Sequence, residues 1–408
     1  MEGLYVAGGE IRQDLAVEAG QDRVSEILGH LIQVRNLSIL IGAGASFHLG
    51  SPTIRNVTRD YVRSMMSDAD VESRDDVDAL LDVLISGRAD LEAVLQKLQA
   101  ALGYVRAFDS NSFTLEARNF DTDILESTYA GLNRALVHAC ELPLPGSSTE
   151  ILFPHQEFFR RLLGARRTEL PRLKVFTTNY DLVIEKSLDG LGVQYLDGFR
   201  GGILRQLDLS SYNSEIFAID KSKSGRLVRQ QELVHLYKIH GSLNWRRNEV
   251  GPEFGVSGIV QSDMNTSSDS LAVIYPTPAK DADVLGYPYS DLLRIFGTTL
   301  SDMESAVVIA GYGFADDHLN RLLGQALRHN PTLQILVMDP VGVLEDVSTP
   351  GAAQFKSSLI GRLAQVKDSR LSFITGESGA FRNVFQLLPD VSPESPVDHA
   401  DASSMLSA

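Results

Sequence analysis

The chain has 408 residues, of which 43% are hydrophobic and 22% are charged, a composition typical of a globular protein with a full core. Its 37 Lys and Arg against 53 Asp and Glu give a net charge of −16, which argues against general binding to nucleic acid or anionic membranes. No apolar run reaches the roughly 18 residues of a membrane span, and Met1–Gly20 lacks the apolar core of a secretory signal. The single cysteine, Cys140, can form neither an internal disulfide nor a four-cysteine zinc site. We therefore expect a cytoplasmic protein without a membrane or direct nucleic-acid partner.

A strand followed by a glycine-rich turn comes early in the chain. Asp22–Val34 has helical periodicity, Leu37–Ile41 predicts a buried strand, and Gly42-Ala43-Gly44-Ala45-Ser46 predicts a tight turn into a helix. Glycines at such a turn let a ligand approach the backbone, and free N–H groups at a helix start stabilise anions. The turn is therefore a candidate phosphate cradle. Phe47 replaces the third glycine of the dinucleotide fingerprint, so a turn without a ligand remains the alternative.

Residues 56 to 165 predict a mostly helical block that interrupts the strands of one sheet. The polar stretch Gly103–Asp121 predicts a loop within the block. We therefore expect a large helical insertion at about 56–165. The predicted helices are Asn56–Met66, Val77–Leu84, Leu91–Leu102, Leu125–Ala139 and Phe153–Leu163.

Short apolar strands alternate with helices in the remaining chain. This alternation predicts an α/β fold with a parallel sheet covered by helices on both faces. Residues from about 190 to 232 predict a loop-rich insertion, and 389–408 a disordered tail, so residues 1–388 form the folded domain. The predicted strands are Leu173–Thr178, Val234–Ile239, Ala272–Tyr275, Ala306–Ala310, Leu333–Met338 and Leu371–Ile374, and the predicted helices between them are Asp181–Leu188, Pro288–Ser301 and Leu319–Arg328.

Residues that carry glycine, hydroxyl, amide, imidazole or carboxylate groups follow five of the predicted strands, Leu37–Ile41 included. Ligands of open parallel sheets bind beyond the carboxyl ends of the strands, so these residues are expected to meet at one edge. Individually, Asn179 can also cap a helix and His240 can be a core histidine. Asp316-Asp317-His318 is a weak metal candidate, and capping of a helix by Asp316 is the better interpretation. The five runs are Gly42–Ser46, Thr177-Thr178-Asn179-Tyr180-Asp181, His240-Gly241-Ser242, Gly311-Tyr312-Gly313-Phe314 and Asp339-Pro340.

Several of these runs resemble a known family. Gly-Ala-Gly-Ala-Ser, Thr-Thr-Asn-Tyr-Asp and Lys238-Ile239-His240-Gly241-Ser242 resemble the sirtuin-like NAD-consuming proteins, and the run at Gly311 resembles a later glycine/serine block of that family. The overall layout resembles the bacterial sirtuin-like proteins of anti-phage defence. One group of those works beside a HerA-type ATPase, which makes such an ATPase a candidate partner.

The resemblance implies a Rossmann-like domain with an NAD site. It places Asn179 beside the nicotinamide ribose, Asp181 at the nicotinamide amide and His240 as the catalytic histidine. Thr178 stands where deacylases usually have glutamine, and the deacylases' zinc ribbon has no counterpart here. The implied catalytic residues are Asn179, His240 and Asp181, and the implied NAD-binding residues are Gly42, Ala43, Gly44, Ser46, Thr178, Gly311, Gly313 and Asp339.

The hypothesis from sequence is an NAD hydrolase that depletes NAD as an anti-phage defence effector. NAD is the substrate, no metal is expected, and we expect a homo-oligomer. Cleavage of the nicotinamide–ribose bond builds an oxocarbenium-like cation, and the imidazole of His240 is suited to accept a proton near neutral pH. Two alternatives stay open: a deacylase or ADP-ribosyl transferase with the same site, and a non-catalytic NAD- or ADP-ribose-binding subunit of a DNA-processing ATPase complex.

Overall fold

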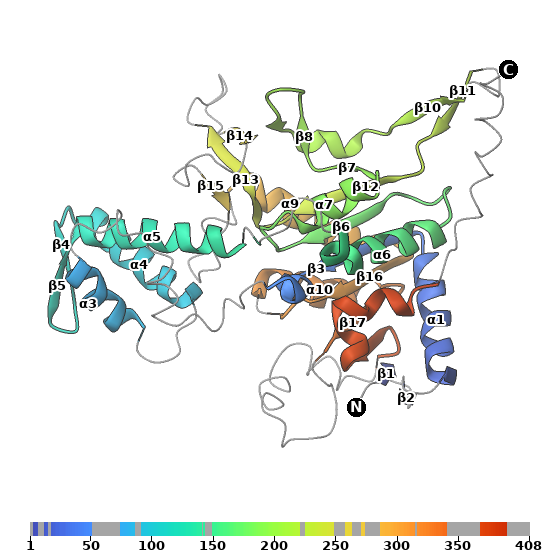
Figure 1. Ribbon diagram of the computed structural model, residues 1–408, viewed down its shortest axis with the longest axis horizontal. Helices are drawn as coiled ribbons and strands as arrows, with labels where there is room; N and C mark the ends of the chain where they lie inside the picture. Colours follow the sequence, from blue (N-terminus) through green and yellow to red (C-terminus); the bar gives the residue numbers. More distant parts are fainter. Residues whose placement is uncertain are drawn as a thin grey trace.

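The computed structural model describes most of the chain. Elements of the described residues are shown in Figure 1. The picture shows a sheet covered by helices and, to one side, a smaller helical unit. The predicted helix Asn56–Met66 and the predicted tail, apart from Pro389, fall outside this description. The described residues are 3–6, 12–14, 18–50, 74–85, 91–140, 142, 149–220, 225–248, 258–262, 271–273, 286–314, 316–340 and 368–389.

The described strands build a nine-stranded sheet in the order β2-β1-β18-β17-β16-β3-β6-β12-β7. The seven strands from β18 to β7 run parallel, which confirms the prediction, while β1 and β2 add an antiparallel edge that the sequence analysis missed. In chain order the strands are β1 (Gly3–Val6), β2 (Arg12–Asp14), β3 (Asn36–Ile41), β6 (Leu173–Thr177), β7 (Gln194–Leu196), β12 (Leu233–Lys238), β16 (Ser305–Ala310), β17 (Gln334–Asp339) and β18 (Leu371–Thr375).

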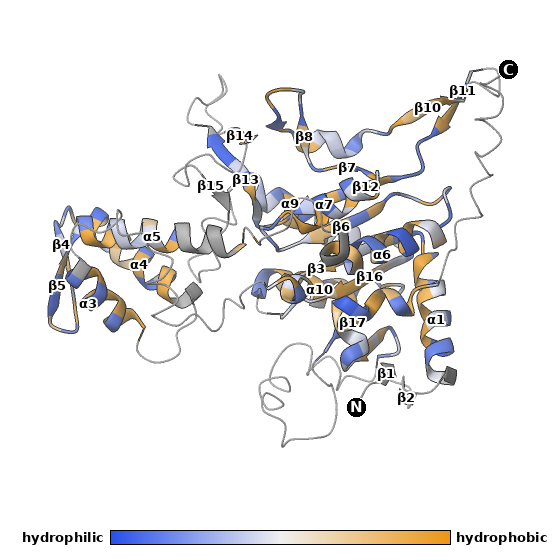
Figure 2. Cartoon of the chain, in the orientation of Figure 1, coloured by the Kyte–Doolittle hydropathy of each residue, from blue (hydrophilic) through white to orange (hydrophobic). Residues whose placement is uncertain are grey.

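Helices cover both faces of this sheet because alternate strand residues point to opposite faces. Ile39 and Val308 belong to a core with α1, α6, α7 and α13, whereas Leu40 and Ile309 belong to a core with α9 and α10. Figure 2 shows hydrophobic residues concentrated along the central strands and on part of each covering helix. The arrangement is a Rossmann-like α/β fold. The helices are α1 (Glu18–Ile32), α6 (Thr149–Ala165), α7 (Val183–Gly190), α9 (Tyr289–Ser301), α10 (Asp317–His329) and α13 (Phe381–Val384).

The strand order reverses at the centre of the sheet. After β3, the chain places β6 and β12 on one side, and it later places β16, β17 and β18 on the other. The carboxyl ends of these strands are level, since Ile41 pairs with both Thr177 and Ala310. In open parallel sheets this switch point is where the loops separate and leave room for a ligand.

The described helices within the predicted insertion at about 56–165 divide between two cores. Helices α3 (Arg74–Leu84), α4 (Leu91–Ala107) and α5 (Thr122–Cys140) share a core of their own, to one side of the sheet in Figure 1. Helix α6 is instead part of the main domain, because Phe158 and Phe159 are buried in the core beneath the sheet. The expected loop at 103–121 contains the end of α4 and a hairpin of β4 (Ser112–Leu115) and β5 (Arg118–Asp121).

The predicted loop-rich insertion at about 190–232 contains a hairpin and two strands of a second sheet, which continues after His240. Its strand β15 overlaps the predicted strand Ala272–Tyr275, which therefore does not belong to the parallel sheet. A five-stranded antiparallel sheet has the order β15-β13-β14-β9-β8, and Trp245 from β13 packs edge-on against Phe199 of β8. The residues of these strands are aperiodic or separated by long loops, which hid the pairing. The bounds are β8 (Phe199–Arg200), β9 (Gln206–Leu207), β13 (Gly241–Asn248), β14 (Gly258–Gln261), β15 (Leu271–Val273), and β10 (Phe217–Asp220) with β11 (Arg226–Arg229) for the hairpin. Across the described helices, none combines the length and apolar character needed to cross a bilayer.

Candidate active site at the carboxyl edge of the sheet

The glycine-rich turn leads into a helix, as predicted, and this helix is a short 3-10 helix, η1 (Ala43–Leu49). The helix ends at Gly50, whose φ of 83° is left-handed. The N–H of Gly42 donates to the carbonyl of Ala310 at 3.0 Å, and the N–H of Gly44 donates to the carbonyl of Gly311 at 2.8 Å. The loops after β3 and β16 are therefore joined by backbone hydrogen bonds.

Close packing of these two loops explains the glycines. A Cβ atom on Gly42 would lie 2.6 Å from the carbonyl oxygen of Gly311, and one on Gly44 would lie 2.9 Å from it. Gly311 itself has a φ of +65°, and a Cβ there would lie 2.2 Å from the nitrogen of Ala45. Ligand atoms were expected in this space, but the backbone of Gly311 occupies it and the Gly44 N–H already donates to the carbonyl of Gly311. Ala43 and Gly44 remain exposed at the sheet edge, where a ligand can reach them.

A buried hydrogen-bonded group joins the ends of β3 and β6. Ser46 Oγ donates to Asp181 Oδ2 at 3.0 Å, so its only proton is used there. Ser46 can then only accept from Asn179, whose Nδ2 lies 3.3 Å away. This orients the amide and leaves Asn179 Oδ1 buried with no hydrogen-bond partner among the described residues. A buried acceptor that lacks a donor, at the switch point of a sheet, is suited to accept a hydrogen bond from a ligand.

A buried ion pair fixes the loop that carries Asn179 and Asp181. Lys238, the last residue of β12, is 2% exposed and lies 2.8 Å from Glu185 Oε1 on α7. Its ammonium also donates to the carbonyls of Tyr180 and Asp181. Burial raises the pKa of the Glu185 carboxyl, and the Lys238 ammonium opposes that rise. No role was predicted for this pair, although a lysine inside an apolar strand, two residues before His240, was the available signal.

His240 pairs with a carboxylate from the opposite half of the sheet. Its Nε2 lies 2.9 Å from Asp316 Oδ2, and both side chains are buried. Asp316 Oδ1 accepts the N–H groups of His318 and Leu319, which confirms the predicted cap at the start of α10. The pairing with His240 was not predicted, because it joins loops from two separate strands.

The two predicted catalytic loops leave neighbouring strands at the same level. Lys238 is paired with Thr177, so Asn179 and His240 each lie two residues beyond that pair. The ring centroids of Tyr180 and His240 are 6.5 Å apart. The fold therefore gathers Ser46, Asn179, Asp181, His240 and Asp316 along the carboxyl ends of β3, β6, β12 and β16.

Three other predicted ligand residues lie at the same edge without joining this group. Thr178 is half-buried, and its N–H donates to the carbonyl of Ile41 at 3.2 Å. Gly313 is exposed in the loop after β16. Asp339 ends β17 opposite Thr375 of β18, two strands from β3. Their roles toward NAD stay predictions.

The described part of the chain brings together no group of three or more His, Cys, Asp or Glu side chains that could hold a metal ion. Asp317 and His318, the other members of the weak metal candidate, lie at the start of α10. The donors gathered at the sheet edge are therefore an amide, an imidazole, a hydroxyl and carboxylates already bonded within the protein.

A protein-family match covers the segment that contains most of the candidate site residues. Residues 173–346 match the family model of a SIR2-like domain. The match contains Asn179, Asp181, His240 and Asp316 but leaves out the Gly42–Ser46 turn, and it covers fewer than half of the 408 residues. It supports the sirtuin-like resemblance and an NAD-binding function. No curated protein matches the chain.

Solved structures of Sir2 homologues are similar to the chain at low identity. One is a triple mutant in complex with 2′-O-acetyl ADP-ribose, with 14% identity, 90% of this chain and 99% of that chain covered, and a TM-score of 0.37. Another is a Sir2 homologue in complex with NAD, with 13% identity, 88% and 91% covered, and a TM-score of 0.36. At this identity and TM-score, the ligands bound in those structures are not assigned to this chain.

Proposed function

We propose that this chain is a sirtuin-like NAD hydrolase that releases nicotinamide and ADP-ribose, and that it acts as an anti-phage defence effector by depleting NAD. The observation that carries the proposal is the buried Oδ1 of Asn179, which has no hydrogen-bond partner among the described residues and lies at the same edge of the sheet as the His240–Asp316 pair. The SIR2-like match over residues 173–346 supports the choice of NAD as substrate.

Asn179 fits the ribose end of the substrate. Its Oδ1 is an acceptor without a donor, and a ribose hydroxyl supplies one. Ser46 and Asp181 hold the amide in that orientation, so no reorganisation is required when the substrate binds. The exposed backbone at Ala43 and Gly44 is the proposed place for the pyrophosphate, since it lies at the same edge and carries no acidic side chain.

The proposed reaction is displacement of nicotinamide by water at the C1′ carbon of the ribose. The C–N bond breaks with its electron pair passing to the nicotinamide ring, which neutralises the positive charge of that ring. The water oxygen bonds to C1′ and gives up one proton, which His240 accepts. Asp316 then stabilises the imidazolium formed, as a carboxylate beside a general-base histidine does. The leaving group needs no metal, so we propose that cleavage is metal-independent.

The products of the purified chain test the proposal. NAD is incubated with the chain alone and with a HerA-type ATPase, the proposed partner, in buffer with and without a chelator. Free ADP-ribose and nicotinamide in equal amounts, unchanged by the chelator and lost in His240→Ala, are the expected result. Nicotinamide together with ADP-ribose attached to a macromolecular acceptor would instead indicate a transferase. Nicotinamide together with an acyl group transferred from an added acylated substrate to ADP-ribose would indicate a deacylase. Binding of ADP-ribose without any product would indicate a binding subunit, and the hydrolase proposal would be wrong.

Oligomerisation is a separate part of the proposal. We propose a homo-oligomer, alone or with the ATPase, which light scattering of the purified chain tests directly. A mass equal to 44.7 kDa at all concentrations, with and without the ATPase, would contradict it.

A further inference from the structure

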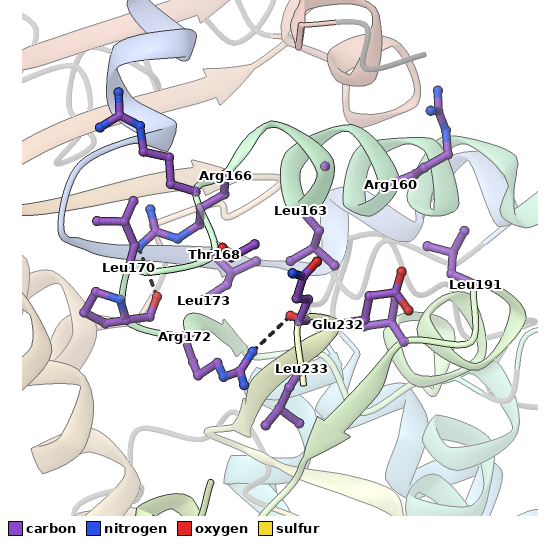
Figure 3. Close-up of a pocket in the computed structure, with 15 residues that line it drawn as sticks. Arg160, Leu163, Arg166, Thr168, Leu170, Arg172, Leu173, Leu191, Glu232 and Leu233 are labelled. Carbon is purple, nitrogen blue, oxygen red and sulfur yellow. Dashed lines mark hydrogen bonds between the residues drawn. The ribbon is translucent and has the colours of Figure 1, made fainter. Parts of the chain in front are cut away.

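A pocket lies at the amino-terminal edge of the sheet, opposite the candidate active site. It has a volume of about 350 Å³, within the range of small-molecule sites. Figure 3 shows side chains from the end of α6 (Leu163), the start of β6 (Arg172) and the start of β12 (Leu233) around the same space. Strands β6 and β12 thus begin at this pocket and end at the loops of Asn179 and His240.

One part of the pocket wall is apolar. Leu173 and Val193 belong to the core between α6, α7 and the sheet, and Leu163 and Leu191 pack against that core, so this side of the wall is held in place. An apolar group placed against them removes further apolar surface from water. The apolar lining residues are Leu163, Leu170, Pro171, Leu173, Leu191, Val193 and Leu233.

The rest of the wall is strongly basic for a chain of net charge −16. Four lining side chains are arginines, Arg160, Arg166, Arg167 and Arg172, whereas Glu232 is the one acidic lining residue. Each of two glutamates next to the pocket forms ion pairs with two arginines. Glu157 pairs with Arg160 and Arg161, and Glu215 pairs with Arg172 and Arg229. The pocket therefore keeps an excess of positive charge after its ion pairs are formed.

Two of these arginines have no carboxylate partner among the residues described. Arg166 is buried and donates to the carbonyls of Ile32, Val34, Arg35 and Pro171, which leaves its Nε buried without a partner. Burial lowers the pKa of Arg166 to about 10, so it stays charged at neutral pH. Arg167 is exposed, and its guanidinium makes no hydrogen bond within the described chain.

We propose that this pocket binds an amphipathic anion, a small molecule with one carboxylate, phosphate or sulfonate group on an apolar body. The anionic group pairs with Arg167 beside the charge of Arg166, and the apolar body covers Leu163, Leu191 and Val193. A guanidinium is suited to this role because it donates two parallel hydrogen bonds to an oxyanion. The excess of positive charge argues against a metal ion. The proposal is independent of what binds at the carboxyl edge.

A matched pair of fluorescent probes tests the proposal on the full chain. The first is 8-anilinonaphthalene-1-sulfonate, an anion on an apolar body, and the second is N-phenyl-1-naphthylamine, its uncharged counterpart. We expect saturable binding of the sulfonate with one site per chain. Arg167→Gln weakens sulfonate binding about tenfold, the effect of losing one charge-assisted hydrogen bond, and leaves the uncharged probe unaffected. Arg118→Gln, an exposed arginine on the β4–β5 hairpin, is the control and leaves both affinities unchanged.

Two further measurements locate the probe. Leu191→Trp fills the apolar side of the pocket and should weaken both probes, whereas excess ADP-ribose should displace neither. Equal sulfonate affinity of the wild type and Arg167→Gln would overturn the proposal even if Leu191→Trp fails to fold. Displacement of the sulfonate by ADP-ribose would overturn it as well, because the probe would then occupy the opposite edge of the sheet.

Discussion

The Nε2 atom of His240 lies 2.9 Å from Oδ2 of Asp316, a residue 76 positions further along the chain. The other oxygen of the same carboxylate accepts two backbone N–H groups at the start of α10. Asp316 is thereby held by a helix while it holds the imidazole, which fixes the ring between the β12 and β16 loops. A histidine held in this way presents a defined nitrogen to a substrate.

Asp316→Asn separates these two functions of the carboxylate. Asparagine is as good a helix cap as aspartate, so the free energy of unfolding should change by less than about 1 kcal/mol. Its amide lacks the negative charge that stabilises the imidazolium, so kcat for nicotinamide release should fall by roughly 10²-fold or more, with a smaller change in KM. Asp317→Asn, on the exposed neighbour, is the control for both measurements. Wild-type kcat in Asp316→Asn would show that the pair has no part in the reaction.

Gly44→Ala tests the contact between the two glycine loops. The new Cβ would lie 2.9 Å from the carbonyl oxygen of Gly311, so the loops must move apart. We expect a lower melting temperature and at least tenfold weaker ADP-ribose binding in calorimetry. Gly29→Ala is the control, because nothing lies within 4 Å of a Cβ there and alanine stabilises a helix by about 0.5–1 kcal/mol. Unchanged ADP-ribose affinity in Gly44→Ala would separate the glycine turn from the binding site.

Substitutions of Lys238 and Glu185 should have strongly non-additive effects on the free energy of unfolding, because the two side chains form an ion pair. Lys238→Met leaves the Glu185 carboxylate buried without its counter-charge and should cost about 3–5 kcal/mol of unfolding free energy. Adding Glu185→Leu removes that buried charge, so the double variant should be more stable than Lys238→Met alone. Urea unfolding of the four proteins in this cycle measures the coupling. Additive losses would show that the two side chains do not interact.

Because His155 is buried, the free energy of unfolding should fall at acidic pH. It is buried on α6, stacked on His48 at 5.2 Å and packed against Phe381, and burial lowers its pKa from 6.5 to about 3, with the positive charge of His48 adding to the effect. Between these two values the unfolded chain binds the proton and the folded chain does not. The free energy of unfolding therefore falls as the pH is lowered through this window, by about 1.4 kcal/mol per pH unit.

His155→Phe should remove this contribution. Neither ring nitrogen of His155 has a hydrogen-bond partner within the described residues, so an apolar ring loses no polar contact there. Between pH 6.5 and 5, the stability of the wild type should drop by about 1.6 kcal/mol more than that of the variant, as measured by urea unfolding. His30→Gln, at an exposed position of α1, should keep the wild-type slope. Parallel slopes for the wild type and His155→Phe would contradict the assignment.

Most of the parallel strands, and the edge at which Asn179 and His240 lie, could be predicted from local patterns, whereas the order of the strands was not predicted. Buried parallel strands are continuous apolar runs, and they can be recognised without their neighbours. The His240–Asp316 and Lys238–Glu185 pairs could not be predicted in this way, because each joins loops or elements brought together only by the folded sheet.

The glycine turn shows a different limit of local patterns. Glycines at 42 and 44 predict that another group packs closely against their backbone, but they do not identify that group. In the structure it is the backbone of Gly311. The second sheet around Trp245 was missed for a related reason, since its short strands pair across long loops and leave no period in the sequence.

The central claim is that His240 and Asn179 act on the nicotinamide–ribose bond of NAD. The most direct measurement is the rate of nicotinamide release by wild type, His240→Ala and Asn179→Ala, under the conditions that activate the wild type and with ADP-ribose affinity measured in parallel. The account predicts that each variant folds, keeps most of its ADP-ribose affinity, and loses roughly 10²-fold or more in turnover. The double variant should be little worse than the worse single one, because groups that act as a unit are not additive. Wild-type release of nicotinamide by His240→Ala would contradict the account.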